Sequence, residues 1–502
     1  MENILENKIN LKKIPKDIIW VCNELSKNKF DSYLVGGCVR DLILNREPKD
    51  WDITTNAIPE EIIKIFGEDN TIYENKFGTV GVKIRNQNLE NSKEEVEIAE
   101  VTTYRKEGEY EDFRRPNKIE WGESAEDDLK RRDFTINALA FDPIKNELID
   151  LYNGALDIKE KRIRSVGDAE ERFNEDALRI LRAVRFSAEL NFIISSEVFN
   201  AIYKLGNNLE KISKERIRDE FIKIIMSPNA MNAIIILQKL NILKYISPEL
   251  EASVGVSQNG HHAYDVFEHL LRSLNHAVEK NYDLETRLAA LFHDIGKPKT
   301  RRFDENKKDY TFYGHEVVGA RMVKKILENL KFKKEIIEEV SNLVRWHMFF
   351  SDTEQITLSS VRRLIVNIGK ENIWDLINLR ICDRVGSGVK KEESYRLRKF
   401  ESMIEEALRD PISLKTLKIN GEGIMRELNI KPGKKVGLIL NALFEEVIDN
   451  AEKNNEEYLV NRAKELNELE EKELIELANK GKEKMENKNE EELKEIKRKF
   501  KV

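Results

Sequence analysis

The feature that most constrains the fold of this 502-residue chain is a change in its hydrophobic pattern near residue 155. Before that point, short β-branched runs alternate with amphipathic stretches; the runs are YLVGG, WDITT, GTVGVKI and VEIAEVTT. This alternation predicts a small sheet with helices packed against it. Beyond it the pattern is helical, as in DALRILRAVRFSAEL and RIRDEFIKIIM, so we expect an α+β head followed by all-α parts.

The length of the chain predicts several domains, because single hydrophobic cores stop growing at about 250–300 residues. We expect an α+β head at 1–155, a helical neck at 156–250, a second helical module at 251–395 and a helical tail at 396–502. The tail ends in a Lys/Glu-rich segment that is typical of a solvated helix or coiled-coil arm.

Composition narrows the class of protein. No apolar stretch approaches the roughly 20 residues that span a bilayer, and the start MENILENKINLKK lacks the apolar core of a signal peptide. We therefore expect a cytoplasmic protein without a membrane partner. Cys22, Cys38 and Cys382 are too far apart for a disulfide framework. A net charge of −7 argues against a general nucleic-acid coat, so any RNA site has to be a local basic surface.

Two aspartates in KDWDITTNA are the first candidate site. Asp50 and Asp52 lie two apart on a predicted strand, so both carboxylates should project from one face. Two like charges this close repel unless a cation lies between them. Glu100, on a later strand, could complete the group, and ligands that are all oxygen suit Mg²⁺. D-x-D alone is common, and these acids could equally be ordinary strand-end residues.

A glycine turn precedes the aspartates. In YLVGGCVRDLIL, Gly36 and Gly37 lie between a predicted strand and a predicted helix, and Arg40 falls in the first turn of that helix. Glycines let the backbone approach a phosphate closely, and a helix N-terminus with an arginine favours anions. The arrangement predicts a phosphate-binding turn.

The histidines form a second group. All seven lie between His261 and His347, within helical periodicity. A single histidine on an apolar helix is more often a core residue than a ligand, but here several recur with aspartates on separate predicted helices. Mixed imidazole and carboxylate ligands suit Mn²⁺, Fe²⁺, Co²⁺ or Ni²⁺ better than a structural zinc. The candidate ligands are His269, His293, Asp294, His315, His347 and Asp383.

Ordered motifs give the first 250 residues a family resemblance. The set GGCVRD, DWDITT, EVTTYR, DFRRP, RRDFTINA and EDALRILRAVRF resembles the class II (bacterial-type) CCA tRNA nucleotidyltransferases and their poly(A) polymerase relatives. The fold that this resemblance implies is a polymerase-β-like head with a mixed sheet. Farther along, HDIGK and GHEVVGA resemble the HD phosphohydrolase superfamily over about 260–390.

The resemblance implies roles for individual residues. Asp50 and Asp52 match the family's metal-binding aspartates, and Glu100 matches its third carboxylate. Nucleotide binding is implied for Gly36, Gly37, Arg40, Arg131, Arg132, Asp133 and Asn137. One departure is Phe77, which stands where the family often has histidine.

The neck segment FNEDALRILRAVRF is expected to be one helix on which Asp176 and Arg179 share a face. The family match makes Glu175, Asp176 and Arg179 the nucleotide-selecting motif, with Arg182 one turn on. An accepting Asp and a donating Arg can pair with cytosine or adenine, whereas guanine and uracil reverse the polarity. Each mismatch then costs roughly 1–3 kcal/mol. A surface ion pair is the alternative interpretation.

A charged segment, DFRRP, lies between Glu100 and the RRD motif. Its Asp112 and Arg115 resemble the flexible-loop motif of full CCA-adding enzymes, although a solvated loop would look similar. The head also lacks the Gly-Arg-Arg-Phe type of signature of the poly(A) polymerase branch. Both observations favour CCA addition over poly(A) addition.

The resulting hypothesis is addition of CCA to the 3′ end of tRNA from CTP and ATP, with two Mg²⁺ ions held by the head. One ion would lower the pKa of the RNA 3′-hydroxyl and the other would stabilise the leaving pyrophosphate. The HD module would bind a transition metal and hydrolyse phosphate esters, or serve as a scaffold. Two alternatives stay open: a poly(A) polymerase, and an HD hydrolase with a degenerate head.

The KPGKK stretch of the tail offers a weaker site. It lies in a segment that resembles the RNA-contacting tail of HD-containing relatives, and Lys431, Lys434 and Lys435 around Gly433 could meet phosphates. A linker between helices explains the same residues.

Overall fold

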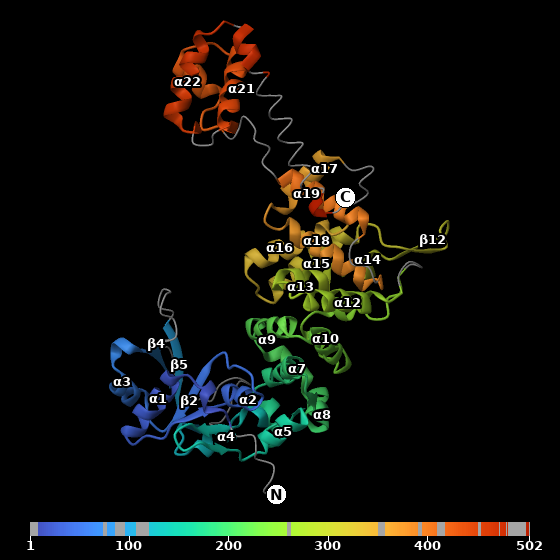
Figure 1. Ribbon diagram of the computed structural model, residues 1–502. Helices are drawn as coiled ribbons and strands as arrows, with labels where there is room; N and C mark the ends of the chain where they lie inside the picture. The colour runs from blue at the N-terminus through green and yellow to red at the C-terminus, as the bar shows by residue number, and fades with distance from the viewer. Residues whose placement is uncertain are drawn as a thin grey trace. The chain divides into compact units, whose positions relative to one another are not determined.

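A computed structural model describes residues 9–73, 78–85, 96–106, 120–258, 263–349, 357–389, 394–408, 417–449, 453–470, 472–477, 479 and 498–500 (Figure 1). The chain divides into two compact units. One comprises residues 1–345 and 382–388, and the other comprises 346–381 and 389–502. The division into four domains expected from the sequence stays a prediction.

The first unit begins with a seven-stranded sheet of order β3-β4-β5-β2-β1-β8-β9. Its strands are β1 (Tyr33–Val35), β2 (Trp51–Thr55), β3 (Thr71–Tyr73), β4 (Thr79–Arg85), β5 (Val96–Thr103), β8 (Ala140–Asp142) and β9 (Glu147–Ile149). Strands β2 and β5 pair in parallel and the other neighbours are antiparallel. The α+β head with a mixed sheet, expected from the sequence, is confirmed, and its four predicted runs are β1, β2, β4 and β5.

One face of this sheet is covered by helices and carries the core. Successive side chains of a strand point to opposite faces, so Ile53 is fully buried while Asp52 beside it is partly exposed. Helices α1 (Lys16–Lys27) and α3 (Pro59–Phe66) contact β4. Asp52 of β2 and Glu100 of β5 thus lie on the face opposite the core.

The neck is built from helices with two short strands between them. The helices are α5 (Gly154–Glu160), α6 (Ala169–Glu175), α7 (Leu178–Leu190), α8 (Ser196–Leu205), α9 (Lys214–Met226), α10 (Ala230–Lys239) and α11 (Pro248–Glu251), whereas α4 (Ala125–Lys130) precedes β8 and belongs to the head. Helix α7 is buried along most of its length and packs against α9 and α10. The purely helical neck expected from the sequence is corrected by β10 (Arg162–Ile163) and β11 (Ile193–Ile194), which pair in parallel. Two-residue strands are too short to leave a periodic signal.

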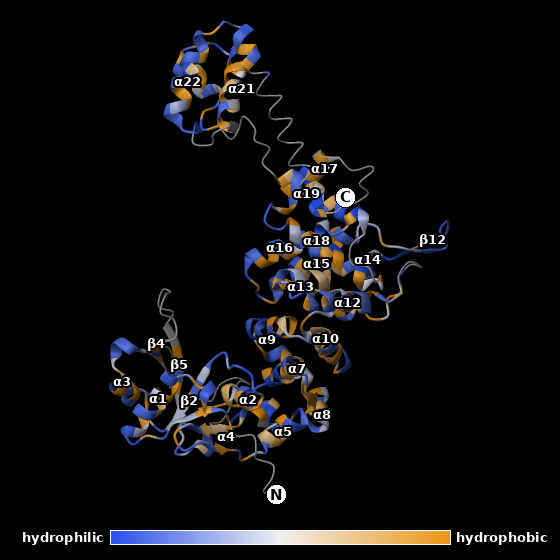
Figure 2. Ribbon diagram, in the orientation of Figure 1, coloured by the Kyte–Doolittle hydropathy of each residue, from blue (hydrophilic) through white to orange (hydrophobic). Residues whose placement is uncertain are grey.

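The histidine module follows in the same unit and is also mainly helical. Its helices are α12 (Val266–Glu279), α13 (Leu284–Phe292), α14 (Lys297–Thr300), α15 (His315–Asn329), α16 (Lys334–Trp346) and the end of α18 (Ile373–Gly386). Figure 2 shows hydrophilic and hydrophobic residues on the same helices, as amphipathic packing requires. A hairpin of β12 (Arg302–Asp304) and β13 (Asp309–Thr311), which the sequence did not predict, separates α14 from α15.

The second unit contains α17 (Leu358–Ile368), α19 (Tyr395–Leu408), α20 (Gly421–Leu428), α21 (Lys434–Asp449) and α22 (Glu456–Glu468). Helices α20 to α22 share a hydrophobic core that includes Ile424, Leu443 and Leu466, all fully buried. The tail therefore has a core of its own. Among the helices that the structure describes, none combines the length and the apolar composition needed to cross a bilayer.

Candidate active site and metal centre

Parallel pairing of β2 with β5 brings two of the three predicted carboxylates together. In the register of these strands Asp52 lies directly opposite Glu100, and Asp50 immediately precedes β2. The adjacency of the two strands expected from the sequence is confirmed. Asp50 differs from its prediction, because it stands just outside the strand rather than in it.

The electrostatics of this acidic group suit a cation. Burial raises the pKa of Asp52 to about 6; the Arg132 guanidinium opposes this, while the carboxylates of Glu100 and Asp50 add to it. Among the residues that the structure describes, these three do not form a group whose oxygens all lie within 4.8 Å of one another. An all-oxygen donor set suits Mg²⁺, which keeps several of its waters and therefore needs few protein ligands.

Two arginines of the RRD motif are held by one buried acid. Asp128, on α4, is fully buried and accepts hydrogen bonds from Arg131 Nε at 2.9 Å and from Arg132 Nη2 at 3.0 Å. Burial would raise the pKa of Asp128, but the two guanidinium groups hold it below its usual value. The ion pairs fix both arginines without a ligand present.

Gly36 allows one of these arginines to approach the backbone. Its φ of 78° lies in the region that favours glycine, and a Cβ there would be 2.6 Å from Arg132 Nη1. Gly37 begins α2 (Gly37–Ile43). The predicted glycine turn therefore lies beside Arg132, which the sequence also predicted as a nucleotide-binding residue.

Asp133 and Asn137 join a hydrogen-bond network behind the arginines. Asp133 Oδ2 accepts from Arg182 Nε at 2.6 Å, and Asp133 Oδ1 accepts from Asn137 Nδ2 at 3.3 Å. Asn137 Oδ1 in turn accepts from Arg40 Nη1 at 2.8 Å. The network brings together four residues predicted separately from the sequence, from α2 to α7.

The predicted neck helix is the main correction at this site. The expectation that Asp176 and Arg179 share one helix face is wrong, because α6 ends at Glu175 and Asp176 has extended backbone with φ −144°. Arg179 Nη1 instead donates to Glu175 Oε2 at 2.5 Å. Asp176 accepts two hydrogen bonds from Arg216 of α9, at 2.7 and 3.2 Å. Asp176 also caps the following turn through the Leu178 amide, which is how an Asp interrupts a helix.

The flexible-loop residues Asp112 and Arg115, and Phe77, lie outside the described residues. The structure does describe the two short strands that flank residues 107–119. They are β6 (Arg105–Lys106) and β7 (Glu120–Trp121), which pair antiparallel.

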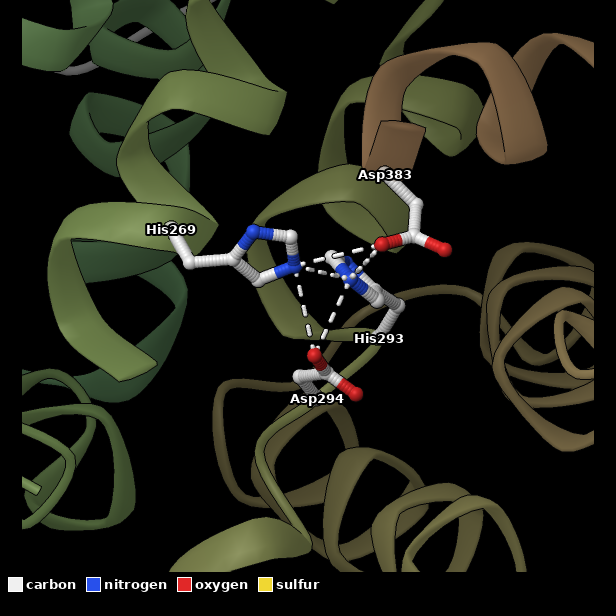
Figure 3. A group of neighbouring side chains, drawn as sticks. All are labelled: His269, His293, Asp294 and Asp383. Carbon is white, nitrogen blue, oxygen red and sulfur yellow. Dashed lines mark hydrogen bonds and ion pairs between the residues drawn. The ribbon is translucent and has the colours of Figure 1, made fainter. Parts of the chain in front are cut away.

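The histidine module brings four predicted ligands together (Figure 3). His269 comes from α12, His293 and Asp294 follow α13, and Asp383 comes from α18. One ligand atom of each lies within 4.8 Å of the others. His269 Nε2 is 2.9 Å from His293 Nε2, 3.2 Å from Asp294 Oδ2 and 3.3 Å from Asp383 Oδ1.

The separations of 2.9–3.3 Å between these ligand atoms are those expected around a single metal ion. Ligands at about 2.0–2.2 Å from a shared ion are about 3–3.5 Å from one another. The His293 and His315 rings are also oriented as metal ligands usually are, because their Nδ1 atoms lie 3.0 Å from Ala290 O and 2.7 Å from Phe312 O. Burial would lower the pKa of His293, but the Asp294 and Asp383 carboxylates raise it. The negative field of this cluster favours a cation.

Two predicted ligands lie outside this group of four, namely His315 and His347. His315 Nε2 is 3.1 Å from Asp294 Oδ1, the carboxylate oxygen that faces away from His269 and His293. His347 is buried but belongs to the second unit, so its role as a ligand stays a prediction. In the tail, Lys431 and Gly433 lie in the exposed turn between α20 and α21, and Lys434 and Lys435 begin α21.

Three residues of these sites were not predicted from the sequence. Asp128 holds both RRD arginines, Arg216 holds Asp176, and Lys297 Nζ lies 2.5 Å from Asp294 Oδ2. Lys297 belongs to the quoted HDIGK motif and Asp128 lies three residues before Arg131, so local spacing could have drawn attention to both. Arg216 is 40 residues from its partner, and no local pattern marks it.

Comparison with known families agrees with this division of sites. Residues 32–164 match the family described as the poly A polymerase head domain. Residues 191–254 match one described as a probable RNA and SrmB-binding site of polymerase A, and residues 266–384 match the HD domain. The nucleotidyltransferase and HD families depend on divalent metal ions.

Whole-chain relatives give the same result. A CCA-adding enzyme of Lactococcus lactis is 31% identical over 91% of this chain and 100% of its own length. One from Ligilactobacillus salivarius is 31% identical over 91% of this chain and 97% of its own. The crystal structure of the Bacillus stearothermophilus CCA-adding enzyme in complex with CTP is 26% identical, with a TM-score of 0.58 over 90% of this chain and 97% of that one. This chain therefore belongs to the CCA-adding enzyme family.

Proposed function

We propose that this protein adds CCA to the 3′ end of tRNA in the cytoplasm, using CTP and ATP as substrates. The observation that carries the proposal is the pairing of Asp52 opposite Glu100, beside Arg132 and Gly36. Nucleotidyl transfer needs a cation site next to a site for triphosphate, and these residues offer both. Membership of the CCA-adding enzyme family favours this activity over poly(A) addition.

In this proposal, Asp50, Asp52 and Glu100 would hold Mg²⁺, which would supply activation of the 3′-hydroxyl and charge neutralisation at the leaving pyrophosphate. Arg131 and Arg132, fixed by Asp128, bind phosphate oxygens of the incoming nucleotide. Because the ion pairs form without a nucleotide, little ordering is left for the binding step.

Base selection is proposed for Asp176 and Arg179. A carboxylate has about four acceptor positions and a guanidinium has five N–H groups. Among the described residues, Asp176 accepts from Leu178 and Arg216, and Arg179 donates to Glu175 and to the carbonyls of Arg172 and Arg131. Asp176 therefore keeps an acceptor and Arg179 keeps donors for the edge of cytosine or adenine.

The test is Asp52→Ala, with Asp69→Ala as the matched control because Asp69 is an exposed aspartate of the same domain. We expect Asp52→Ala to abolish nucleotide incorporation at unchanged circular dichroism, and Asp69→Ala to keep it. Near-normal incorporation by Asp52→Ala would remove this residue from the active site.

A second activity is proposed for the histidine module, namely metal-dependent hydrolysis of phosphate esters such as 2′,3′-cyclic RNA ends. The observation that favours it is the convergence of His269, His293, Asp294 and Asp383. These residues would hold Mn²⁺, Fe²⁺, Co²⁺ or Ni²⁺, and such an ion supplies a water that is acidic enough to attack phosphorus near neutral pH. Lys297, held between Asp294 and Gln258, provides a buried positive charge beside the cluster.

His293→Ala tests this second activity, with His276→Gln as the control because His276 is a buried histidine of α12 outside the cluster. We expect His293→Ala to lose both bound metal, measured by mass spectrometry of the digested protein, and opening of a cyclic phosphate. Metal retention by wild type without turnover under any of the four metals would make the module a scaffold.

A further inference from the structure

The β12–β13 hairpin is inserted between two parts of the HD cluster. The chain leaves the cluster after Asp294 and Lys297, forms the hairpin, and returns at His315. Phe312, directly after β13, accepts the His315 Nδ1 hydrogen bond through its carbonyl at 2.7 Å. Figure 1 shows the hairpin extending away from the helices of the module. The base of the hairpin is thus joined directly to the cluster, through Lys297 on one side and His315 on the other.

The hairpin region is basic and aromatic, in a chain whose net charge is −7. Between residues 299 and 313 its cations are Lys299, Arg301, Arg302, Lys307 and Lys308, and its acids are Asp304, Glu305 and Asp309. Two of its aromatic rings are open to solvent, since Phe303 is 51% exposed and Tyr313 is 75% exposed.

Strand register separates the charges. Phe303 lies opposite Tyr310, with the two rings edge to face at 5.4 Å, and the Arg301 guanidinium lies 3.6 Å from the Tyr310 ring centre. Asp304 lies opposite Asp309, so both project to the other side. Both also accept backbone hydrogen bonds, Asp304 from the turn and Asp309 from Tyr310. One side is therefore a platform of the Phe303 and Tyr310 rings with Arg301, whereas Arg302, opposite Thr311, lies on the side of the two aspartates.

Folding requirements account for only part of this platform. A hairpin with three residues in each strand is marginal in water, and a Phe303–Tyr310 cross-strand pair helps to hold it. Tyr313 lies beyond the strands, and its hydroxyl accepts a hydrogen bond from Lys307 Nζ at 2.6 Å. This hydrogen bond keeps a cation next to an exposed ring but adds nothing to the core.

We propose that this platform, comprising Arg301 and Phe303 together with Lys307 and Lys308 of the turn and Tyr313 after the strands, binds single-stranded RNA. Bases stack on the Phe303 and Tyr313 rings, and the cations contact phosphates, as in sequence-tolerant single-strand sites. The inference rests on the proposed RNA substrate and adds a binding surface that holds an unpaired RNA segment beside the HD cluster.

The test uses the full chain and a fluorescently labelled unstructured RNA decamer, in EDTA so that no hydrolysis occurs. We expect Phe303→Ala/Tyr313→Ala to weaken binding by at least about twenty-five-fold, because stacking on each of the two rings is worth a factor of roughly five to one hundred. Tyr313→Phe should bind like wild type because it keeps the ring. Tyr395→Ala, which removes a 55% exposed tyrosine elsewhere, is the matched control.

Two further measurements locate the binding. A double Lys307→Gln/Lys308→Gln variant should reduce the slope of log affinity against log salt by about 0.7 for each phosphate that is no longer neutralised. A decamer carrying 4-thiouridine should photo-cross-link to the peptide that contains the hairpin. The proposal is overturned if wild type does not bind the decamer or if the aromatic variant binds it equally well. It is also overturned if the aromatic substitutions weaken the binding of duplex RNA as much as the binding of the decamer.

CCA addition measured in the same preparations separates this inference from the proposed function. The hairpin variants should keep it, because none of their residues belongs to the head. A wild type that binds the decamer through the hairpin but adds no nucleotides would contradict the proposed function and leave the hairpin result standing.

Discussion

At the scale of single residues, the head depends on arginines that are fixed before substrate arrives. Arg132 is held by a buried carboxylate on one side and lies against a glycine backbone on the other. Asp128 is fully buried, and a Cβ at Gly36 would lie 2.6 Å from Arg132 Nη1. A substitution at either position would therefore disturb the Arg132 side chain. Substitutions at these two positions should therefore affect nucleotide binding.

Gly36→Ala should lower activity more than it lowers stability. A methyl group at Gly36 meets Arg132, whereas at Gly67 it meets nothing within 4 Å, although both glycines have positive φ. Each substitution should cost about 1–3 kcal/mol of folding free energy through backbone strain. Only Gly36→Ala should raise the KM for CTP and ATP, roughly tenfold, in steady-state assays. Equal KM values for the two variants would contradict the placement of Arg132.

Asp128→Asn should show a pH-dependent loss of stability. The pKa of Asp128 is lowered in the folded protein, so its ion pairs stabilise the fold fully above about pH 4 and lose this effect as the pH falls through the lowered pKa. Denaturant unfolding should give a loss of about 3–5 kcal/mol at pH 7 and a smaller loss at pH 3. A loss of equal size at both values would exclude the ion pairs as its cause.

At the scale of elements, the sequence predicted those with a clear hydrophobic period. WDITT and VEIAEVTT were identified as strands from alternation, and their adjacency brought Asp52 and Glu100 together as expected. The short elements were not predicted. Strands β10 and β11 and the β12–β13 hairpin have two or three residues per strand, which is too few for a hydrophobic period to appear.

The break between α6 and α7 also escaped prediction. The hydrophobic residues of α6 and α7 follow one continuous helical period. Asp176 nevertheless lies outside both helices, where it caps the next turn and pairs with Arg216. Local hydrogen bonding by an Asp competes with helix propagation, and the competition is decided by a partner 40 residues away. Sequence periodicity alone cannot reveal such an ion pair.

Arg216→Gln should reduce the accuracy of nucleotide selection. Asp176 would lose its two hydrogen bonds to α9 and its carboxylate would no longer be held at one position. Loss of about 1.4 kcal/mol of positioning corresponds to a roughly tenfold lower preference for CTP over UTP, measured as a ratio of kcat/KM. Arg218→Gln is the matched control, since Arg218 pairs with its neighbour Asp219. An unchanged ratio in Arg216→Gln would show that this ion pair has no part in selection.

At the scale of the whole molecule, one chain carries two proposed metal-binding centres of different chemistry. The head offers three carboxylates, whereas the histidine module offers imidazoles and carboxylates. The family match made both predictable from short motifs, while their supporting residues, Asp128, Arg216 and Lys297, became visible only in three dimensions.

Metal removal should therefore affect the two centres separately. The HD ligands join α12, the end of α13 and α18, so a bound ion should stabilise this module by about 2.7 kcal/mol at one hundred times its dissociation constant. Chelation should lower the thermal unfolding midpoint of wild type, followed by calorimetry, but not that of His293→Ala. A shift of the same size in both proteins would place the stabilising metal elsewhere.

The most direct test of the central claim is nucleotide incorporation by the purified protein with Mg²⁺. A tRNA lacking CCA and an unstructured RNA would each be given CTP, ATP or both. The account predicts that only the tRNA is extended, by two C and then one A, and that extension then stops. Long A tracts on either RNA, or no incorporation at all, would contradict it.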